Sequence, residues 1–182
     1  MFATMKRPHL YLTGYRGCGK STVAKLLGDS LALPVCDLDS VIEETAGMSI
    51  ADIFARETET GFRDRETKCL EEVAGQPKRV IALGGGAILR SMNRRTIMRT
   101  GWCVWLDADP ATIADRIAGD ATTRERRPSL TGKSVVDEVI DVMNQRESLY
   151  REVADMRVDA SKRPAEEIAS EIRDAFSKLP QW

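Results

Sequence analysis

The sequence predicts an α/β fold in which helices cover both faces of a parallel sheet. Short apolar runs alternate with longer segments of helical spacing, and this alternation is typical of parallel strands joined by helices. A glycine-rich segment at 14–19 separates the first apolar run from the first helical segment. The 182 residues, of which 42% are hydrophobic, suffice for a substantial core in one domain, or in one domain with a small appended lobe.

Five apolar runs predict the strands, at Leu10–Leu12, Pro34–Cys36, Val80–Leu83, Cys103–Leu106 and Arg157–Val158. Eight helices are expected between and after them, at Lys20–Ala32, Ser40–Ala46, Ser49–Glu57, Gly61–Ala74, Asn93–Thr100, Pro110–Ala118, Val135–Tyr150 and Ala165–Lys178. Gly47 marks a helix end, since glycine readily adopts the left-handed conformation there. Pro110 and Pro164 mark helix starts, because the first turn tolerates proline. The extra helices between the second and third strands predict a small lobe, at about 40–74, over the carboxyl edge of the sheet.

The segment after the first strand, GYRGCGKST, fits the GxxxxGKS spacing of a phosphate-binding loop. Glycines let the backbone curl around a triphosphate and offer it many N–H groups, and the helix that follows directs its unpaired N–H groups at the same anion. Lys20 supplies a positive charge for the β- and γ-phosphates, and Ser21 offers a hydroxyl to Mg²⁺. A chance glycine-rich turn is the alternative. The strand before it and the helix after it favour a nucleotide site, with contacts from Gly17, Cys18, Gly19, Lys20, Ser21 and Thr22.

Polar residues and glycines follow the second and third strands, at the edge where ligands bind in open α/β sheets. Asp37 and Asp39 lie two residues apart, so an extended segment directs both carboxylates to the same side. One is then expected to hold a metal through water and the other to orient a hydroxyl nucleophile, with helix-capping acids before Val41 as the alternative. Three glycines at 84–86 are expected to bring bare backbone close to a ligand or to the phosphate-binding loop, although a plain tight turn also fits.

The segment 120–132, DATTRERRPSLTG, is polar and rich in arginine, with almost nothing to bury. It predicts a mobile lid that closes over the phosphates, excludes water and brings positive charge to the transferred group. A solvated surface loop is the alternative for such a charged run.

Composition narrows the class of partner. The net charge is −1, from 27 basic and 28 acidic residues, so no basic field predicts a nucleic-acid partner and a small molecule is expected instead. No apolar stretch approaches the roughly 18 residues of a membrane span. Met1–Lys6 lacks the pattern of a secretory signal, and a cytoplasmic protein without membrane contact is expected.

The cysteines indicate neither a zinc site nor a disulfide framework, because the four of them contain no CxxC pair and the chain has a single histidine. Cys36 and Cys103 lie in strand-like runs and are expected in the core. Cys18, at a helix N-terminus, is either an alkylation-sensitive thiol or a tolerated small side chain.

Together these motifs resemble those of the shikimate kinase family, from Leu10 to about Pro164. The phosphate-binding loop alone is common to many NTPases, whereas DxD, FRxxE and GGG in this order are specific. The resemblance lies in that loop and in DLD (37–39), MSIADIF (48–54), GFRDRE (61–66), GGGA (84–87), RP (127–128) and RESLY (146–150).

The resemblance implies an ATP-dependent, Mg²⁺-assisted phosphoryl transfer to the 3-hydroxyl of shikimate. The product is shikimate 3-phosphate, and the step belongs to chorismate and aromatic amino acid biosynthesis. The resemblance also implies a three-layer P-loop kinase fold like that of nucleoside monophosphate kinases, with five parallel strands in the order 2-3-1-4-5. A single domain over 1–182, with a substrate-binding helical lobe and a lid, is then expected to act as a monomer.

On the nucleotide side, the resemblance assigns Lys20, Ser21 and Asp37 to the phosphates and Mg²⁺. Arg127 corresponds to the lid arginine that reaches the transferred phosphate, and its neighbours Arg124 and Arg126 are further candidates for that contact. Arg163 corresponds to a residue beside the adenine.

On the acceptor side, Asp39 corresponds to the residue that contacts the reacting hydroxyl. Arg63 and Arg146 correspond to a pair that clamps the substrate carboxylate, which a planar guanidinium can grip with two hydrogen bonds. Gly85 adds a backbone contact. Catalysis is expected from Lys20, Asp39 and Arg127.

Two other functions remain open at this point. A kinase of another small hydroxy acid, such as gluconate, would share the phosphate-binding loop and lid, but its acceptor pocket has no need of Asp39, Arg63 and Gly85 at these intervals. A non-catalytic descendant that binds nucleotide for regulation would be free to lose Lys20, Asp39 or the lid arginine, and all are present.

Overall fold

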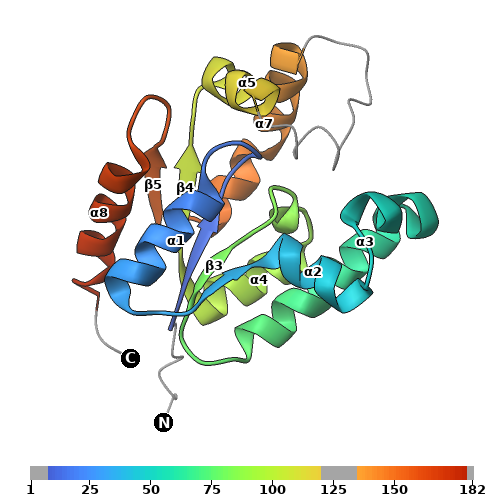
Figure 1. Ribbon diagram of the computed structural model, residues 1–182, viewed down its shortest axis with the longest axis horizontal. Coiled ribbons are helices and arrows are strands. Elements are labelled where there is room, and N and C mark those ends of the chain that lie inside the picture. Colours follow the sequence, from blue (N-terminus) through green and yellow to red (C-terminus); the bar gives the residue numbers. More distant parts are fainter. Residues whose placement is uncertain (1–7, 120–134, 180–182) are drawn as a thin grey trace.

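The computed structural model describes residues 8–119 and 135–179 of the chain. Within these ranges the strands form one parallel sheet in the order β2-β3-β1-β4-β5, the order that the resemblance implied (Figure 1). All five apolar runs expected as strands are strands, with ends that differ by at most two residues. They are β1 His9–Thr13, β2 Val35–Asp37, β3 Val80–Ala82, β4 Gly101–Asp107 and β5 Met156–Asp159.

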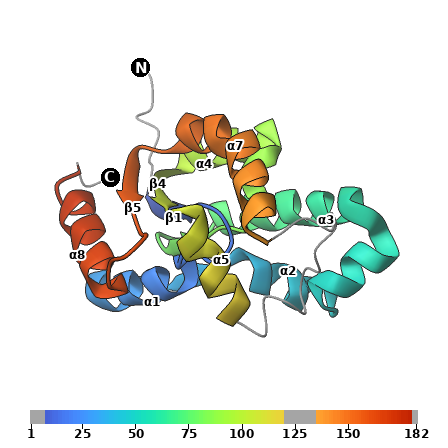
Figure 2. The ribbon, with the colours of Figure 1, turned by 90° about the horizontal axis from the view of Figure 1, so that it is seen from above.

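Helices cover both faces of the sheet, which gives the three layers (Figure 2). On one face α1 (Lys20–Leu31) packs against α8 (Ala165–Phe176). On the other face α4 (Ser91–Thr100) and α7 (Val135–Val153) contact each other and β4. α5 (Pro110–Gly119) follows β4 and packs against α7. No helix among the described residues combines the length and apolar character needed to cross a bilayer.

The two faces of the sheet carry separate apolar cores, because successive strand residues point to opposite sides. In β1, Leu10 and Leu12 enter the core that contains α1 and α8, while Tyr11 enters the core on the opposite face. Cys36 and Cys103 are buried in that second core, as expected. The central strand is therefore fixed from both sides, and with it the loop that follows at its carboxyl end.

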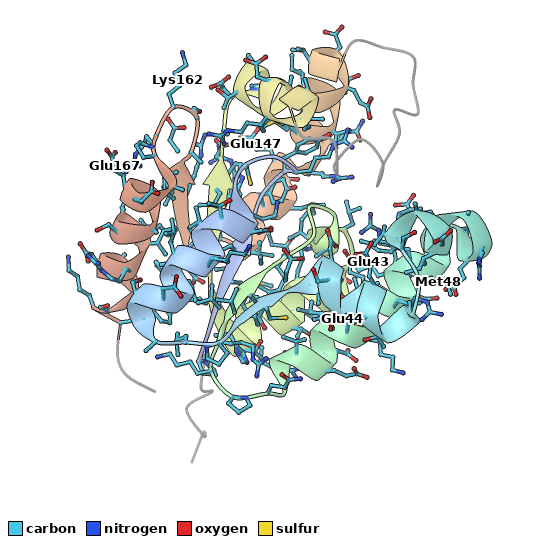
Figure 3. The ribbon with its side chains drawn as sticks, in the orientation of Figure 1. Glu43, Glu44, Met48, Glu147, Lys162 and Glu167 are labelled. Atoms are coloured by element: carbon cyan, nitrogen blue, oxygen red, sulfur yellow. The ribbon has the colours of Figure 1, made fainter. Side chains whose placement is uncertain are left out.

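The predicted lobe consists of α2 (Leu38–Ala46) and the first half of α3 (Ile50–Ala74), which lie to one side of the sheet (Figure 1). Gly47 closes α2 with φ 65°, as the sequence predicted. The carboxylate of Glu43, labelled in Figure 3, accepts a hydrogen bond of 3.0 Å from the N–H of Ile50 and so joins α2 to the start of α3.

The two helices expected at 49–57 and 61–74 form one helical segment with a kink. Thr58 has φ 64° and ψ −177°, outside the helical region. Arg65 donates two hydrogen bonds of 2.7 Å to the carboxylate of Glu57 and thereby bridges the kink. A Cβ on Gly61 would lie 2.5 Å from Cβ of Glu57, so the kink requires the absence of a side chain there. The expected break is thus a bend at one residue.

Candidate active site

The phosphate-binding loop joins β1 to α1 and follows the backbone path that its glycines were predicted to allow. Gly14 and Gly19 have φ 139° and 98°, and a Cβ on Gly14 would collide with the carbonyl oxygen of Leu106. Gly19 precedes α1, and among the described residues no side chain caps the first N–H groups of this helix. These N–H groups and the positive end of the helix dipole form an anion site.

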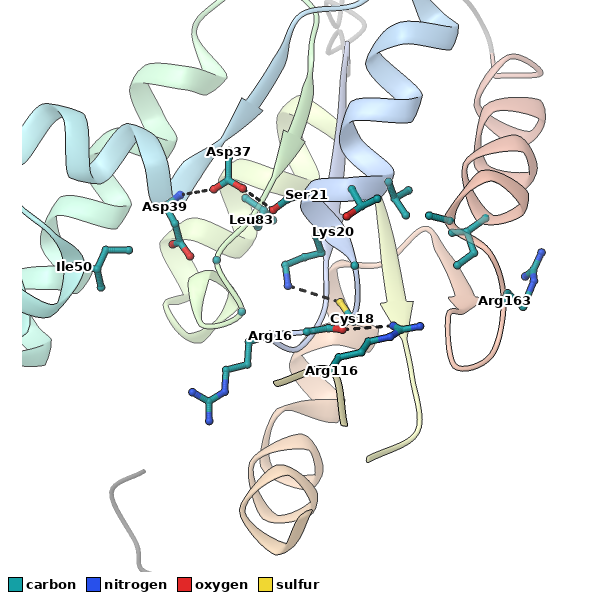
Figure 4. Close-up of a pocket in the computed structure, with 18 residues that line it drawn as sticks. Arg16, Cys18, Lys20, Ser21, Asp37, Asp39, Ile50, Leu83, Arg116 and Arg163 are labelled. Atoms are coloured by element: carbon teal, nitrogen blue, oxygen red, sulfur yellow. Dashed lines mark hydrogen bonds between the residues drawn. The ribbon is translucent and has the colours of Figure 1, made fainter. Parts of the chain in front are cut away.

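Lys20 lies over this loop (Figure 4). Its Nζ donates hydrogen bonds of 2.9 Å to the carbonyl oxygens of Gly14 and Tyr15, and it lies 3.7 Å from Sγ of Cys18. The ammonium group is thus held among loop carbonyls beside the anion site. Cys18 is 1% exposed, which favours the tolerated small side chain over the alkylation-sensitive thiol.

Ser21 and Asp37 meet at the first turn of α1. Oγ of Ser21 donates a 2.7 Å hydrogen bond to Oδ2 of Asp37, which ends β2. A hydroxyl beside a carboxylate is a donor set that suits Mg²⁺, which takes one or two protein oxygens together with phosphates and water. The two side chains therefore fit the metal role that the sequence assigned to them.

Asp37 and Asp39 do not share one extended segment, so the geometric reason given for pairing them was wrong. Asp37 is the N-cap of α2: its Oδ1 accepts from the N–H groups of Asp39 and Ser40 at 3.1 and 3.4 Å. Asp39 already belongs to the first turn of that helix. Asp37 thus combines the helix-capping alternative with a position that suits the metal role: one oxygen caps the helix and the other faces Ser21.

Asp39 and Arg63 both approach the glycine loop 84–86. A Cβ on Gly84 would lie 2.6 Å from Oδ1 of Asp39, and one on Gly86 would lie 2.5 Å from Nη2 of Arg63. Nη1 of Arg63 donates a 2.7 Å hydrogen bond to Oε2 of Glu66, which is fully buried. Bare backbone is therefore required where these side chains gather. Glu66 belongs to the motif FRxxE, but its contact with Arg63 was not predicted from the sequence.

Gly85 connects three parts of the molecule. Its carbonyl oxygen accepts hydrogen bonds from Nη1 of Arg146 at 3.1 Å and from Oη of Tyr150 at 2.8 Å, both on α7. A Cβ on Gly85 would lie 3.3 Å from the backbone of the phosphate-binding loop, at the carbonyl oxygen of Gly14 and the N–H nitrogen of Arg16. The predicted close approach of these glycines to the phosphate-binding loop is thus present.

A cavity of about 520 Å³ joins these groups. It is lined by Arg16, Gly17, Cys18, Gly19, Lys20, Ser21, Thr22, Asp37, Asp39, Gly84, Gly85, Arg116 and Arg163, together with apolar side chains. Arg63 and Arg146 are not part of this lining, and they reach the site through Gly86 and Gly85. Arg127 and the rest of 120–132, including Arg124 and Arg126, lie outside the described residues.

The far end of the cavity carries two arginines, of which the sequence predicted one. Nη2 of Arg163 forms a 2.7 Å ion pair with Glu171. Arg116 of α5 was missed: its guanidinium donates to the carbonyl oxygens of Ala160 at 3.0 Å and Gly17 at 3.4 Å, so it spans the phosphate-binding loop and the segment after β5 (Figure 4). Arg116 is one charged residue in an amphipathic helix, and no sequence pattern indicates that its side chain reaches the phosphate-binding loop.

Comparison with known proteins gives the family. The family model for shikimate kinase matches residues 16–177. The shikimate kinase of Rhodopirellula baltica is 63% identical over 171 residues, which cover 94% of this chain and 91% of that protein. Shikimate kinase 2 of Escherichia coli is 43% identical over 169 residues, which cover 93% and 95%. The structure of shikimate kinase from Acinetobacter baumannii in complex with shikimate matches with a TM-score of 0.87 at 32% identity, over 97% of both chains. The chain therefore belongs to the shikimate kinase family.

Proposed function

We propose that this protein transfers the γ-phosphoryl group of ATP to the 3-hydroxyl of shikimate, giving shikimate 3-phosphate and ADP. Family membership supports the reaction class and the acceptor. The observation that carries the proposal is the gathering of Asp39, Arg63 and Arg146 around the glycine loop 84–86, beside Lys20 and the cavity of about 520 Å³.

On the nucleotide side, the N–H groups at the start of α1 and the ammonium of Lys20 would bind the β- and γ-phosphates. Ser21 and Asp37 would hold Mg²⁺, which neutralises negative charge on the phosphates when it is bound. Arg163, at the end of the same cavity, would lie beside the adenine, and Arg116 of α5 would flank it from the other side of the lining.

On the acceptor side, a carboxylate would bind Arg63 and Arg146, because guanidinium groups offer paired N–H donors. Asp39 would accept the proton of the 3-hydroxyl as that oxygen bonds to phosphorus, and the bond from phosphorus to the bridging oxygen of ADP breaks. The proton then passes from Asp39 to solvent. Holding both substrates in fixed positions would contribute much of the rate enhancement, because the protein takes little covalent part in the reaction.

Further parts of the proposal concern the molecule as a whole. We infer one kinase domain over 1–182, in which about 40–74 binds the acceptor and 120–132 acts as the lid, with Arg127 meeting the transferred phosphate. The protein is proposed to act as a cytoplasmic monomer on small molecules, without a nucleic-acid or membrane partner; the near balance of charge, at −1, supports this.

A coupled assay of ADP release tests the function. The purified protein receives ATP and Mg²⁺ with shikimate, quinate or gluconate offered separately, and a reaction without acceptor gives the background. We expect rapid ADP release with shikimate only. Faster ADP release with gluconate than with shikimate would identify gluconate as the acceptor. ADP release equal to background with all three compounds would mean that the protein binds nucleotide but has no kinase activity.

A further inference from the structure

The carbonyl groups of the glycine loop 84–86 are bonded in two different ways. The carbonyl oxygens of Gly84 and Gly86 accept from the N–H groups of Ala87 and Leu89, each at 3.0 Å, inside the short helix η1 (Ala87–Leu89). The carbonyl oxygen of Gly85 instead accepts from the side chains of Arg146 and Tyr150. The orientation of the middle peptide therefore depends on α7 and not on the loop itself.

Tyr150 is the more rigid of the two donors. It is 2% exposed, and its ring stacks on Trp105 of β4 with ring centres 5.6 Å apart and an angle of 18° between the planes. Burial raises the pKa of its phenol well above the ordinary value, so the hydroxyl stays protonated and remains a donor. The phenol can therefore donate the 2.8 Å hydrogen bond to Gly85 at neutral pH.

Arg146 is the less constrained donor, and the substrate competes for it. It lies one helical turn before Tyr150 on α7, is half-buried, and gives one N–H to Gly85 out of the five that a guanidinium carries. When Arg146 turns to bind a carboxylate, the hydrogen bond from Tyr150 keeps the Gly85 carbonyl satisfied. Without Tyr150 the same turn would leave the half-buried carbonyl of Gly85 without a protein donor, which disfavours substrate binding.

We propose that Tyr150 is a positioning residue for the acceptor: its hydrogen bond to Gly85 fixes the loop 84–86 and frees Arg146 to bind the carboxylate of the substrate. Tyr150 would act on the substrate through the loop 84–86 and Arg146, without contacting the substrate itself. This inference rests on the proposed function, because it takes shikimate as the acceptor.

The test is Tyr150→Phe, with Tyr11→Phe as the matched control. Tyr11 is also fully buried, and its phenol forms one 2.8 Å hydrogen bond, with Oγ of Thr100, which is not part of the site. Both variants lose the hydrogen bonding of a buried phenol, so we expect similar losses of thermal stability. In Tyr150→Phe alone, we expect KM for shikimate to rise by about fivefold, the size of one hydrogen bond, with kcat and KM for ATP each within about twofold.

Amide hydrogen exchange without ligands gives a second readout that does not need activity. The N–H groups of Ala87 and Leu89 report on the loop, and we expect them to exchange faster in Tyr150→Phe than in Tyr11→Phe or the unmodified protein. Equal KM values for shikimate in the two variants, or equal exchange at these amides, would overturn the proposal. If the unmodified protein does not phosphorylate shikimate, the proposed function fails, and the exchange rates alone then decide whether Tyr150 fixes the loop.

Discussion

At the scale of single residues, Lys20 offers the most direct test of the nucleotide site. Lys20→Ala removes both the charge over the anion site and the two 2.9 Å hydrogen bonds to Gly14 and Tyr15. We expect kcat to fall by more than about tenfold, equivalent to about 1.4 kcal/mol of barrier, because water in the pocket replaces a fixed charge poorly. Lys25→Ala, an exposed change on the same helix, is the control. Steady-state kinetics that leave Lys20→Ala above a tenth of the original kcat would remove Lys20 from the mechanism.

Asp39 separates chemistry from binding on the acceptor side. Asp39→Asn keeps the shape of the side chain but loses the group proposed to take the hydroxyl proton. We expect kcat to fall by about a hundredfold or more, while the dissociation constant of ATP changes little. Asp29→Asn, on the exposed face of α1, controls for the loss of one charge. An unchanged kcat with weakened ATP binding would move Asp39 to the nucleotide side.

Local structure around the candidate site was predictable where a motif is contiguous. The phosphate-binding loop is such a case, because its backbone conformation follows from its own glycines and the helix after it. Tyr150 and Arg116 form hydrogen bonds to residues far away in the sequence, Gly85 and Ala160, and no local pattern encodes such contacts. The extended conformation predicted for Asp39 was wrong, because β2 ends at Asp37 and helix α2 begins at the next residue.

At the scale of elements, the kink in α3 stores backbone strain at Thr58. Its φ of 64° with ψ of −177° is a region that glycine occupies freely and a β-branched residue does not. We expect Thr58→Gly to raise the free energy of unfolding by about 1 kcal/mol, the strain relieved less the added entropy of the unfolded chain. Ala55→Gly, in the regular part of the same helix, should lower it by about 1 kcal/mol. Urea denaturation measures both, and destabilisation by Thr58→Gly would show that this backbone conformation is not a source of strain.

The ion pair across the same kink makes the stability of α3 depend on pH. Hydrogen bonds from Arg65 lower the pKa of Glu57 below its ordinary value of 4.5. A lowered pKa in the folded state means that the carboxylate stabilises the fold above about pH 4.5, and that this contribution is lost as the pH falls through the folded-state value. Glu57→Gln should therefore be less stable than the unmodified protein at pH 7, with the difference shrinking below pH 4.5. Thermal melts between pH 7 and pH 3 measure this, with Glu44→Gln on α2 as the charge control; a difference that does not depend on pH would contradict it.

The elements themselves were largely predictable, since strands and helices follow from apolar periodicity. The main difference from the predicted elements is α3, which is one kinked helix where two helices, at 49–57 and 61–74, were expected. The sequence predicted a break between Glu57 and Gly61, but whether the chain breaks or bends there depends on the contact between Glu57 and Arg65. That contact joins the two halves of α3, and the apolar periodicity within either half does not predict it.

For the molecule as a whole, binding of both substrates should raise thermal stability. Ligands that bind only the native state stabilise it by mass action, by about 2.7 kcal/mol at one hundred times the dissociation constant. For a chain of this size we expect Tm to rise by about 5–10 °C with saturating ADP, Mg²⁺ and shikimate. Replacing shikimate by gluconate should give the shift of ADP and Mg²⁺ alone. A further shift with gluconate would argue against an acceptor site selective for shikimate.

The topology of the sheet also sets the order in which the molecule can be assembled. Among the residues that the structure describes, β1 pairs with β3, from Val80, and with β4, from Gly101, so the chain must be more than half synthesised before its central strand has both neighbours. Until then a nascent chain on the ribosome carries Leu10 and Leu12 without the strands that bury them, and its phosphate-binding loop has no rigid base. Such late, long-range pairing slows folding and exposes apolar segments to aggregation. We therefore expect that nucleotide cannot assist folding early in synthesis, and that these apolar segments stay exposed until β4 has emerged.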